Sequence, residues 1–151
     1  MSETESLGND LLRSAARLSR WASRHAAFDV PFAQARLLAL LDELGPSRIS
    51  TLAEADHSSQ PTMTAQVHRV EAAGWARREP DPDDSRAVLV SLTPVGSAKL
   101  HEVRLARAAV LEPALDRLAG PATERVRAAV DVLEELLALT SSPDPHPRKD
   151  G

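Results

Sequence analysis

The sequence predicts a mainly α-helical chain that carries one small β-hairpin. Aromatic residues make up only 3% of the 151 residues, so the core must be built from Leu, Ala and Val, and a chain rich in Ala and Leu favours helices. Between residues 75 and 92, two short runs with alternating apolar residues flank a cluster of turn formers, which is typical of a hairpin. The length predicts one domain, and a hydrophobic content of 42% is enough for a core.

Two helices are expected in the first third of the chain. Residues 1–8 are predicted to be a flexible N-terminus, and a first helix follows over about Asn9 to Ala27. Pro31 begins a second helix that ends near Leu44, because Gly45-Pro46 stops it. Next, Ile49 is expected to form a short strand that extends the hairpin.

A pair of short helices comes next. Ser50 or Thr51 starts the first of them. The second is capped by Ser59 or Gln60 and ends at Gly74. At 100° per residue its apolar residues Met63, Val67 and Val70 share one side, while Pro61, Ala65, His68 and Ala72 lie opposite, flanked by Thr62, Thr64 and Arg69. A helix that enters the major groove of DNA needs such an anchored back and short polar front, although an ordinary surface helix can share the pattern.

The predicted hairpin has strands at residues 75–80 and 87–92 and a charged tip at residues 81–86. It is too small to be stable alone, so it must lean on the helices while its tip projects. Arg86 could then enter a minor groove, with Asp84 orienting its guanidinium by a paired hydrogen bond. A solvated charged turn is the alternative. A short helix followed by such a hairpin is typical of a winged helix-turn-helix, which reads duplex DNA.

Two long helices should complete the chain. Thr93-Pro94 opens a helix that reaches about Leu118 and kinks near residues 110–112, because Pro113 lies within it. The last helix spans about residues 122–139. Its apolar band, which is too wide for an isolated surface helix, comprises Val126, Ala129, Val130, Leu133, Leu136 and Leu137. We therefore expect this helix to pack against another subunit, and residues 141–151 to be a disordered tail.

The stretch from Ser59 to Gly96 resembles the MarR family of bacterial transcription regulators. The family pattern is a recognition helix, a glycine, a hairpin with DP-x-D-x-R, and then LT-x-x-G. This chain matches it at Met63-Thr64, Glu71, Gly74, Arg78, Asp81 to Arg86 and Leu92 to Gly96. The resemblance implies an intertwined homodimer held by N- and C-terminal helices. Residues 9–30 and 94–140 would form the dimerisation region, and residues 31–93 the DNA-binding lobe.

The chain departs from the family pattern before the recognition helix. The family usually has a glycine between two apolar residues there, whereas this sequence has Asp56, His57 and Ser58. The glycine would supply a left-handed turn, which Asp and His tolerate better than most residues. We therefore expect the turn to be kept.

The resemblance and the helix orientation together give candidate DNA contacts. They are Ser59, Gln60, Pro61, Thr62, Thr64, Ala65, Gln66, His68, Arg69, Arg77, Asp84, Ser85 and Arg86. A dimer is expected to bind an imperfect palindrome with half-sites about one helical turn apart and to repress neighbouring genes. The net charge of −4 predicts modest non-specific affinity and a moderate salt dependence.

The family also suggests a small aromatic ligand in a cleft between the helical region and the lobe. Candidate ligand residues are Trp21, His25, Phe28, Phe32 and Arg36. The alternative is that the aromatic residues simply close the core. A second open question concerns the arginine stripe of the first helix (Arg13, Arg17, Arg20 and Arg24). It is either a solvated face or pairs with Asp131, Glu134 or Glu135 of a partner subunit.

Other classes of function find little support in the sequence. There is no cysteine, no P-loop or other nucleotide-binding glycine pattern, and no zinc-like spacing of histidines, so neither an enzyme nor a bound metal or cofactor is expected. No membrane span or signal peptide is recognisable, which predicts a cytoplasmic, nucleoid-associated protein. A protein-interaction module without DNA binding of its own remains the alternative.

Overall fold

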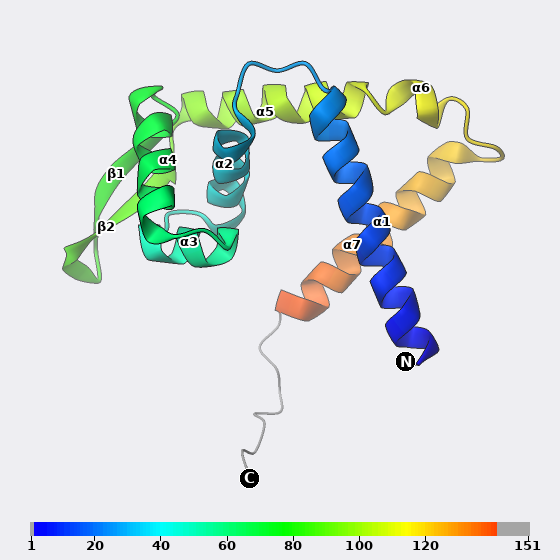
Figure 1. Cartoon of the computed structure of the whole chain (residues 1–151), viewed down its shortest axis with the longest axis horizontal. Helices are drawn as coiled ribbons and strands as arrows, with labels where there is room; N and C mark the ends of the chain where they lie inside the picture. The colour runs from blue at the N-terminus through cyan, green and yellow to red at the C-terminus, as the bar shows by residue number, and fades with distance from the viewer. Residues whose placement is uncertain (1, 142–151) are drawn as a thin grey trace, which may run out of the picture. The chain divides into compact units, whose positions relative to one another are not determined.

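The computed structural model describes residues 2–141 (Figure 1). Residues up to Leu111 form one compact unit, and residues from Glu112 form a second. The first unit holds five helices (α1–α5) and a β-hairpin, and the second holds helices α6 and α7. The predicted class, mainly helical with one small hairpin, is confirmed.

Helix α1 (Glu3–His25) begins six residues earlier than predicted. The Ser2 hydroxyl accepts a hydrogen bond from the Glu5 backbone N–H (3.1 Å), and the Glu5 carboxylate accepts one from the Ser2 N–H (2.6 Å). This capping box satisfies amides that the first turn would otherwise leave without partners. The prediction of a flexible segment is therefore wrong for residues 3–8, which form the first turns of the helix.

Helices α2 (Phe32–Leu44) and α3 (Ile49–Asp56) follow. The expected strand at Ile49 is wrong, because this residue already begins α3. The extended residue is Ser47, whose N–H donates to the Val90 carbonyl (3.0 Å) and whose carbonyl accepts from the Val90 N–H (2.8 Å). The strand contact therefore lies two residues earlier, where the backbone is still extended, and Ile49 packs against the core.

Both ends of helix α4 (Gln60–Ala72) carry the expected turn residues. His57, at the place of the family's glycine, has a left-handed backbone (φ 54°, ψ 35°) and caps α3, so the turn is kept. Ser59 caps α4. At the other end, Gly74 has φ +78°, and the N–H groups of Gly74 and Trp75 donate to the carbonyls of Glu71 and Val70 (both 2.9 Å). This Schellman motif ends the helix.

Strands β1 (Ala76–Asp81) and β2 (Asp84–Leu92) form an antiparallel hairpin that extends beyond α4 in Figure 1. Asp81 pairs directly with Asp84. The tip is therefore only Pro82-Asp83, rather than the six residues predicted, and residues 84–86 belong to β2.

Helix α5 (Pro94–Ala109) is shorter than predicted, because the chain breaks after Ala109, where only a kink in a helix reaching Leu118 was expected. Ala109 lies four residues before Pro113, whose missing N–H cannot bond to the Ala109 carbonyl. In the second unit, α6 (Glu112–Leu115) is short and α7 (Ala122–Ser141) is long. Ser141 is the last residue of α7, and the rest of the predicted tail, residues 142–151, lies outside the described residues.

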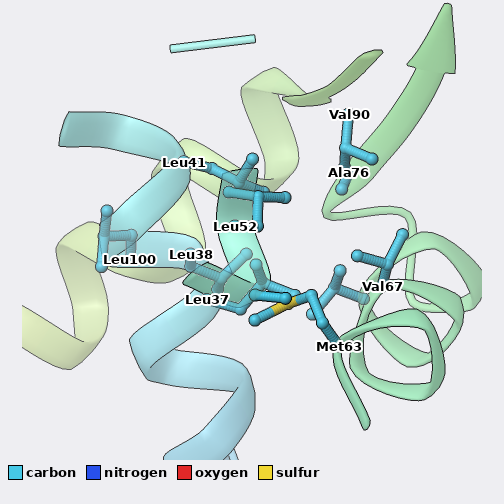
Figure 2. Packing of buried hydrophobic residues seen from close by; sticks show 11 residues of the cluster. Leu37, Leu38, Leu41, Leu52, Met63, Val67, Ala76, Val90 and Leu100 are labelled. Atoms are coloured by element: carbon cyan, nitrogen blue, oxygen red, sulfur yellow. The ribbon is translucent and has the colours of Figure 1, made fainter. Parts of the chain in front are cut away.

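The core lies in the first unit and joins the helices to the hairpin (Figure 2). It is made of Leu37, Leu38 and Leu41 of α2, Leu52 and Ala53 of α3, Met63, Val67 and Val70 of α4, Ala76 and Val90 of the hairpin, and Leu100 of α5. The predicted apolar side of α4 is confirmed, because its three residues are at most 2% exposed. This packing leaves the opposite side of α4 facing outward.

The start of α5 is pressed against the end of α4. The Thr93 hydroxyl donates to the Gly74 carbonyl (2.6 Å) and accepts from the Gly96 N–H (3.0 Å). The Thr93 N–H donates to the Trp75 carbonyl (3.1 Å). A Cβ atom on Gly96 would lie 1.8 Å from the Trp75 carbonyl oxygen, so only glycine fits there.

Candidate DNA-binding interface

The outward side of α4 presents small and polar residues. Ser59, Gln60, Pro61, Thr62, Ala65, His68 and Arg69 are exposed, and Thr64 and Gln66 are half-buried. This side carries no large apolar side chain that would need to be buried, so a polar partner surface can approach the helix. The predicted front of the helix therefore lies together on one accessible surface.

Hydrogen bonds divide these residues into two groups. The hydroxyls of Ser59 and Thr62 are hydrogen-bonded to each other (2.7 Å), and the Thr64 hydroxyl donates to the Gln60 carbonyl (2.8 Å). Among the described residues, the side chains of His68 and Arg69 have no hydrogen-bond or ion-pair partner. His68 and Arg69 are thus the side chains most available to an external partner.

Like His68 and Arg69, Arg86 of β2 has a side chain that is free to contact an external partner. Its side chain is exposed, and its guanidinium has no partner within residues 2–141. The expected pairing with Asp84 is wrong: the Asp84 carboxylate accepts a hydrogen bond from the Arg86 backbone N–H (3.0 Å), not from the guanidinium. The reason is that both residues lie on β2, two positions apart, where this local turn-like bond is favoured. Ser85 is exposed, and Arg77 is exposed with a loose ion pair to Glu79 (3.7 Å).

Two ion pairs attach the hairpin to the helices. Arg78 of β1 donates to Glu71 of α4 (3.0 Å). Arg48, which precedes α3, donates to one oxygen of Asp81 through Nε (2.9 Å) and Nη2 (2.6 Å). Arg48 was absent from the predicted site, because no local sequence pattern joins two residues that are 33 positions apart.

Asp81 is the buried acidic residue of the hairpin, with 7% of its surface exposed. Its second oxygen accepts a hydrogen bond from the Asp83 N–H (2.9 Å). The Asp83 N–H and the Arg48 guanidinium hold the pKa of Asp81 below its ordinary value, and Asp81 raises the pKa of Arg48 in turn. The Asp81 side chain is therefore held as a charged carboxylate, and its bonds to Arg48 and to the Asp83 N–H fix the tip of the hairpin.

The lowered pKa of Asp81 predicts that the folded protein loses stability in acid. Because the pKa of Asp81 is lower in the folded state, its carboxylate stabilises the fold above the ordinary aspartate pKa of about 4. That contribution is lost as the pH falls below this value and through the lower folded pKa. In urea unfolding from pH 7 to pH 3, Asp81→Asn should be less stable than the parent at pH 7, and the gap should close in acid. Asp83→Asn controls for the change in net charge, and a constant gap for Asp81→Asn would contradict the prediction.

A cavity of about 380 Å³ lies between α1, α2 and α5. Its wall is rich in arginine and includes Phe28 and Phe32, whose rings meet edge to face at 5.9 Å. The arginines are Arg20, Arg24, Arg36, Arg104 and Arg107. Arg107 donates to the Ser19 hydroxyl (2.7 Å), while its Nε is buried without a partner among the described residues. Such a wall suits an anionic group joined to an apolar body.

The predicted ligand residues fall into two sets. Phe28, Phe32 and Arg36 line this cavity. Trp21 and His25 do not, because they stack on each other (4.5 Å) on a different side of α1. The alternative of core closure holds for Phe28, which packs against Val30, Ala35 and Val103, but Phe32 is 53% exposed. The five-arginine wall was missed, apart from Arg36, because three separate helices contribute to it.

Comparison with known proteins identifies the family of this chain. The MarR family model matches residues 32–88. An HTH-type transcriptional regulator of Mycobacterium leprae is 30% identical over 132 residues, which cover 87% of this chain and 92% of the relative. The chain belongs to the MarR family.

Solved structures agree with this family assignment. A transcriptional regulator from Thermotoga maritima has a TM-score of 0.71 at 23% identity, over 92% of this chain and 99% of that one. A mutant MarR from E. coli complexed with operator DNA has a TM-score of 0.54 at 22% identity, over 91% of this chain and 93% of that one. The similarity confirms the predicted winged-helix fold of this MarR-family chain.

Within residues 2–141 of this MarR-family chain, every helix is too short or too polar to cross a membrane. The same residues contain no group of three or more His, Cys, Asp or Glu that is arranged to hold a metal ion.

Proposed function

We propose that this MarR-family regulator binds an imperfect palindrome as a homodimer and represses neighbouring genes. One observation carries the proposal: α4 is anchored by a buried back and exposes its polar front, and the hairpin that packs against α4 exposes the unpaired guanidinium of Arg86. A helix for the major groove and a cation for the minor groove are what a winged helix uses to read DNA. The operator complex of the E. coli relative supports the same use of the fold.

Helix α7 supports the dimer. None of its residues is buried, and its apolar band is open, with Val130 46% and Leu137 63% exposed. At 100° per residue, Asp131 and Glu135 lie on the side opposite the band, and only Glu134 lies at its margin. A partner helix on the band would therefore not face most of these carboxylates. For this reason we favour a solvated face as the interpretation of Arg13 and Arg17, whereas Arg20 and Arg24 line the cavity.

The deciding experiment is fluorescence anisotropy with duplexes that flank the protein's own gene, followed by footprinting of the bound fragment. We expect saturable binding and a protected, two-fold symmetric site. Failure to bind any flanking duplex above random DNA would favour the alternative, a protein-interaction module. Action on the chromosome also leads us to propose a cytoplasmic, nucleoid-associated location.

Removing the wing arginine is expected to weaken operator binding without unfolding the protein. Arg86→Ala should cost about 1–3 kcal/mol of binding, which corresponds to about 5- to 150-fold in Kd. The loss follows from an exposed cation that has no intramolecular task. Arg117→Ala, which removes an exposed arginine of the second unit, is the control. An Arg86 variant that binds as tightly as this control would remove the wing from DNA recognition.

The cavity supports a second candidate function, the sensing of a small aromatic anion. Five arginines and two phenylalanines line it, and the buried Nε of Arg107 lacks a partner among the described residues. Arg36 connects the cavity to α3, because it lines the cavity and its guanidinium also binds Asp56, the last residue of α3. A ligand that competes for Arg36 would release the residue next to the turn before α4. Such competition would couple the cavity to DNA binding.

Benzoate and benzamide form a matched pair of probes for this cavity, since they differ mainly in charge. At millimolar concentration, benzoate should raise the melting temperature of the protein, and benzamide should not. The benzoate effect should be lost in Arg107→Met. Equal responses to the two probes would mean that the arginine wall does not select an anion.

A further inference from the structure

Arg48 occupies an unusual place for an arginine. It is the N-cap residue of α3, a position that favours Ser, Thr, Asp or Asn, because their short side chains can accept a hydrogen bond from the first turn. The Arg48 side chain makes no such cap bond. Its guanidinium is directed instead to the tip of the hairpin.

The hairpin is thereby fastened to the chain before α3 at two points. The backbone bridge between Ser47 and Val90 holds the half of β2 that is farther from the tip. The next residue, Arg48, holds the tip by two donors on Asp81, and it also lies 3.7 Å from an oxygen of Asp84. Two adjacent residues thus fix both the position and the direction of the hairpin relative to the helix-turn-helix.

Arg48 also offsets part of the negative charge at the tip of the hairpin. Asp81, Asp83 and Asp84 are three carboxylates beside one cation, Arg86. Three carboxylates would repel the phosphates that Arg86 must approach. Arg48 supplies a positive charge to two of them, and it does so from a guanidinium that is 44% exposed.

We propose that Arg48 is the positioning residue that holds the wing at a fixed offset from α4, so that Arg86 reaches DNA while α4 is docked. The proposal rests on the DNA-binding function given above. Asp81 is the buried anchor on the wing, and Arg48 acts through Arg86 rather than by reading bases itself. The bond between Arg48 and Asp81 then explains why an arginine, rather than a residue that can cap the helix, occupies the N-cap of α3.

A double-mutant cycle tests this role, using the duplex that the protein protects. Arg48→Gln should weaken binding by about 3- to 30-fold when Arg86 is present and by less than about twofold in the Arg86→Ala background. Arg48→Lys should recover part of the loss, because an ammonium can keep one bond to Asp81. Lys99→Gln is the control, since it removes a cation of α5 that is paired with Glu102 at 2.7 Å and belongs neither to the wing nor to the cavity wall.

Each contrary result points to a different error. Equal losses in both backgrounds, with the salt slope reduced by about 1, would show that Arg48 contacts a phosphate itself and would overturn the proposal. A lower melting temperature with unchanged Kd would reduce Arg48 to a structural role. An Arg86→Ala variant with unchanged affinity would overturn both the wing contact and the role of Arg48.

Hydrogen exchange on the free protein separates this proposal from the DNA-binding function itself. The N–H groups of Asp83 and Arg86 are bonded to Asp81 and Asp84, respectively. In Arg48→Gln they should exchange about tenfold faster than in the parent, while α4 amides stay unchanged. Faster exchange in a protein that binds no duplex would refute the DNA function and leave the attachment standing. Unchanged exchange would overturn the attachment.

Discussion

Replacing Gly96 by alanine is expected to destabilise the fold by about 3 kcal/mol. The new methyl group would lie 1.8 Å from the Trp75 carbonyl oxygen, which is backbone and cannot rotate away. Relief requires α5 to move off the end of α4, and this movement breaks the bonds that Thr93 makes to Gly74 and to Trp75. Urea unfolding followed by circular dichroism measures the loss.

Gly8→Ala is the matched control, because it makes the same chemical change in the interior of α1. A Cβ atom at Gly8 meets nothing within 4 Å. Alanine should therefore stabilise the protein by about 0.5–1 kcal/mol through helix propensity. Two glycines with opposite responses would show that packing decides the outcome at Gly96. A Gly96 variant as stable as the parent would contradict the close approach.

Placing carboxylates on the apolar band of α7 is expected to abolish the proposed dimer. Leu133 and Leu137 are 37% and 63% exposed in the single chain, so Leu133→Glu with Leu137→Glu should leave the protomer folded. In a dimer the same positions would bury unpaired charges, which is strongly unfavourable. Sedimentation at micromolar concentration should show a monomer. Operator affinity should fall by about 10²- to 10⁴-fold, because two linked half-sites are reduced to one.

Ala128→Glu supplies the control for this second prediction. Ala128 is exposed and lies on the side of α7 opposite the band, at helical spacing. The variant adds a carboxylate to the same helix, but the dimer should survive. A monomeric Ala128→Glu variant, or a dimeric Leu133/Leu137 variant, would place the subunit interface elsewhere.

Local patterns were sufficient for the elements that carry local signals. The apolar spacing of Met63, Val67 and Val70 predicted the buried back of α4, and Gly74 predicted its end. Pro113 predicted a disturbance of the helix near residues 110–112, because its missing N–H acts on the residue four positions before it, although α5 ends at Ala109 rather than continuing to Leu118 beyond a kink. These predictions succeeded because each depends on residues within one or two turns.

Contacts between distant residues were the part that the sequence did not reveal. The Arg48–Asp81 pair joins residues of two different elements, and the cavity wall gathers arginines from α1, α2 and α5. Neither has a spacing rule, since tertiary packing alone brings the residues together. The start of α1 was missed for a different reason: the capping box at Ser2 and Glu5, which is a local signal, was overlooked.

The bridge between Ser47 and Val90 also bears on how the protein behaves at high concentration. A two-stranded hairpin has two open edges that can recruit strands from other molecules and so start aggregation. Ser47 occupies part of the β2 edge. The β1 edge carries charged residues and Pro80, which lacks an N–H to donate. The hairpin is thereby discouraged from edge-to-edge polymerisation, although it must remain uncovered in order to work.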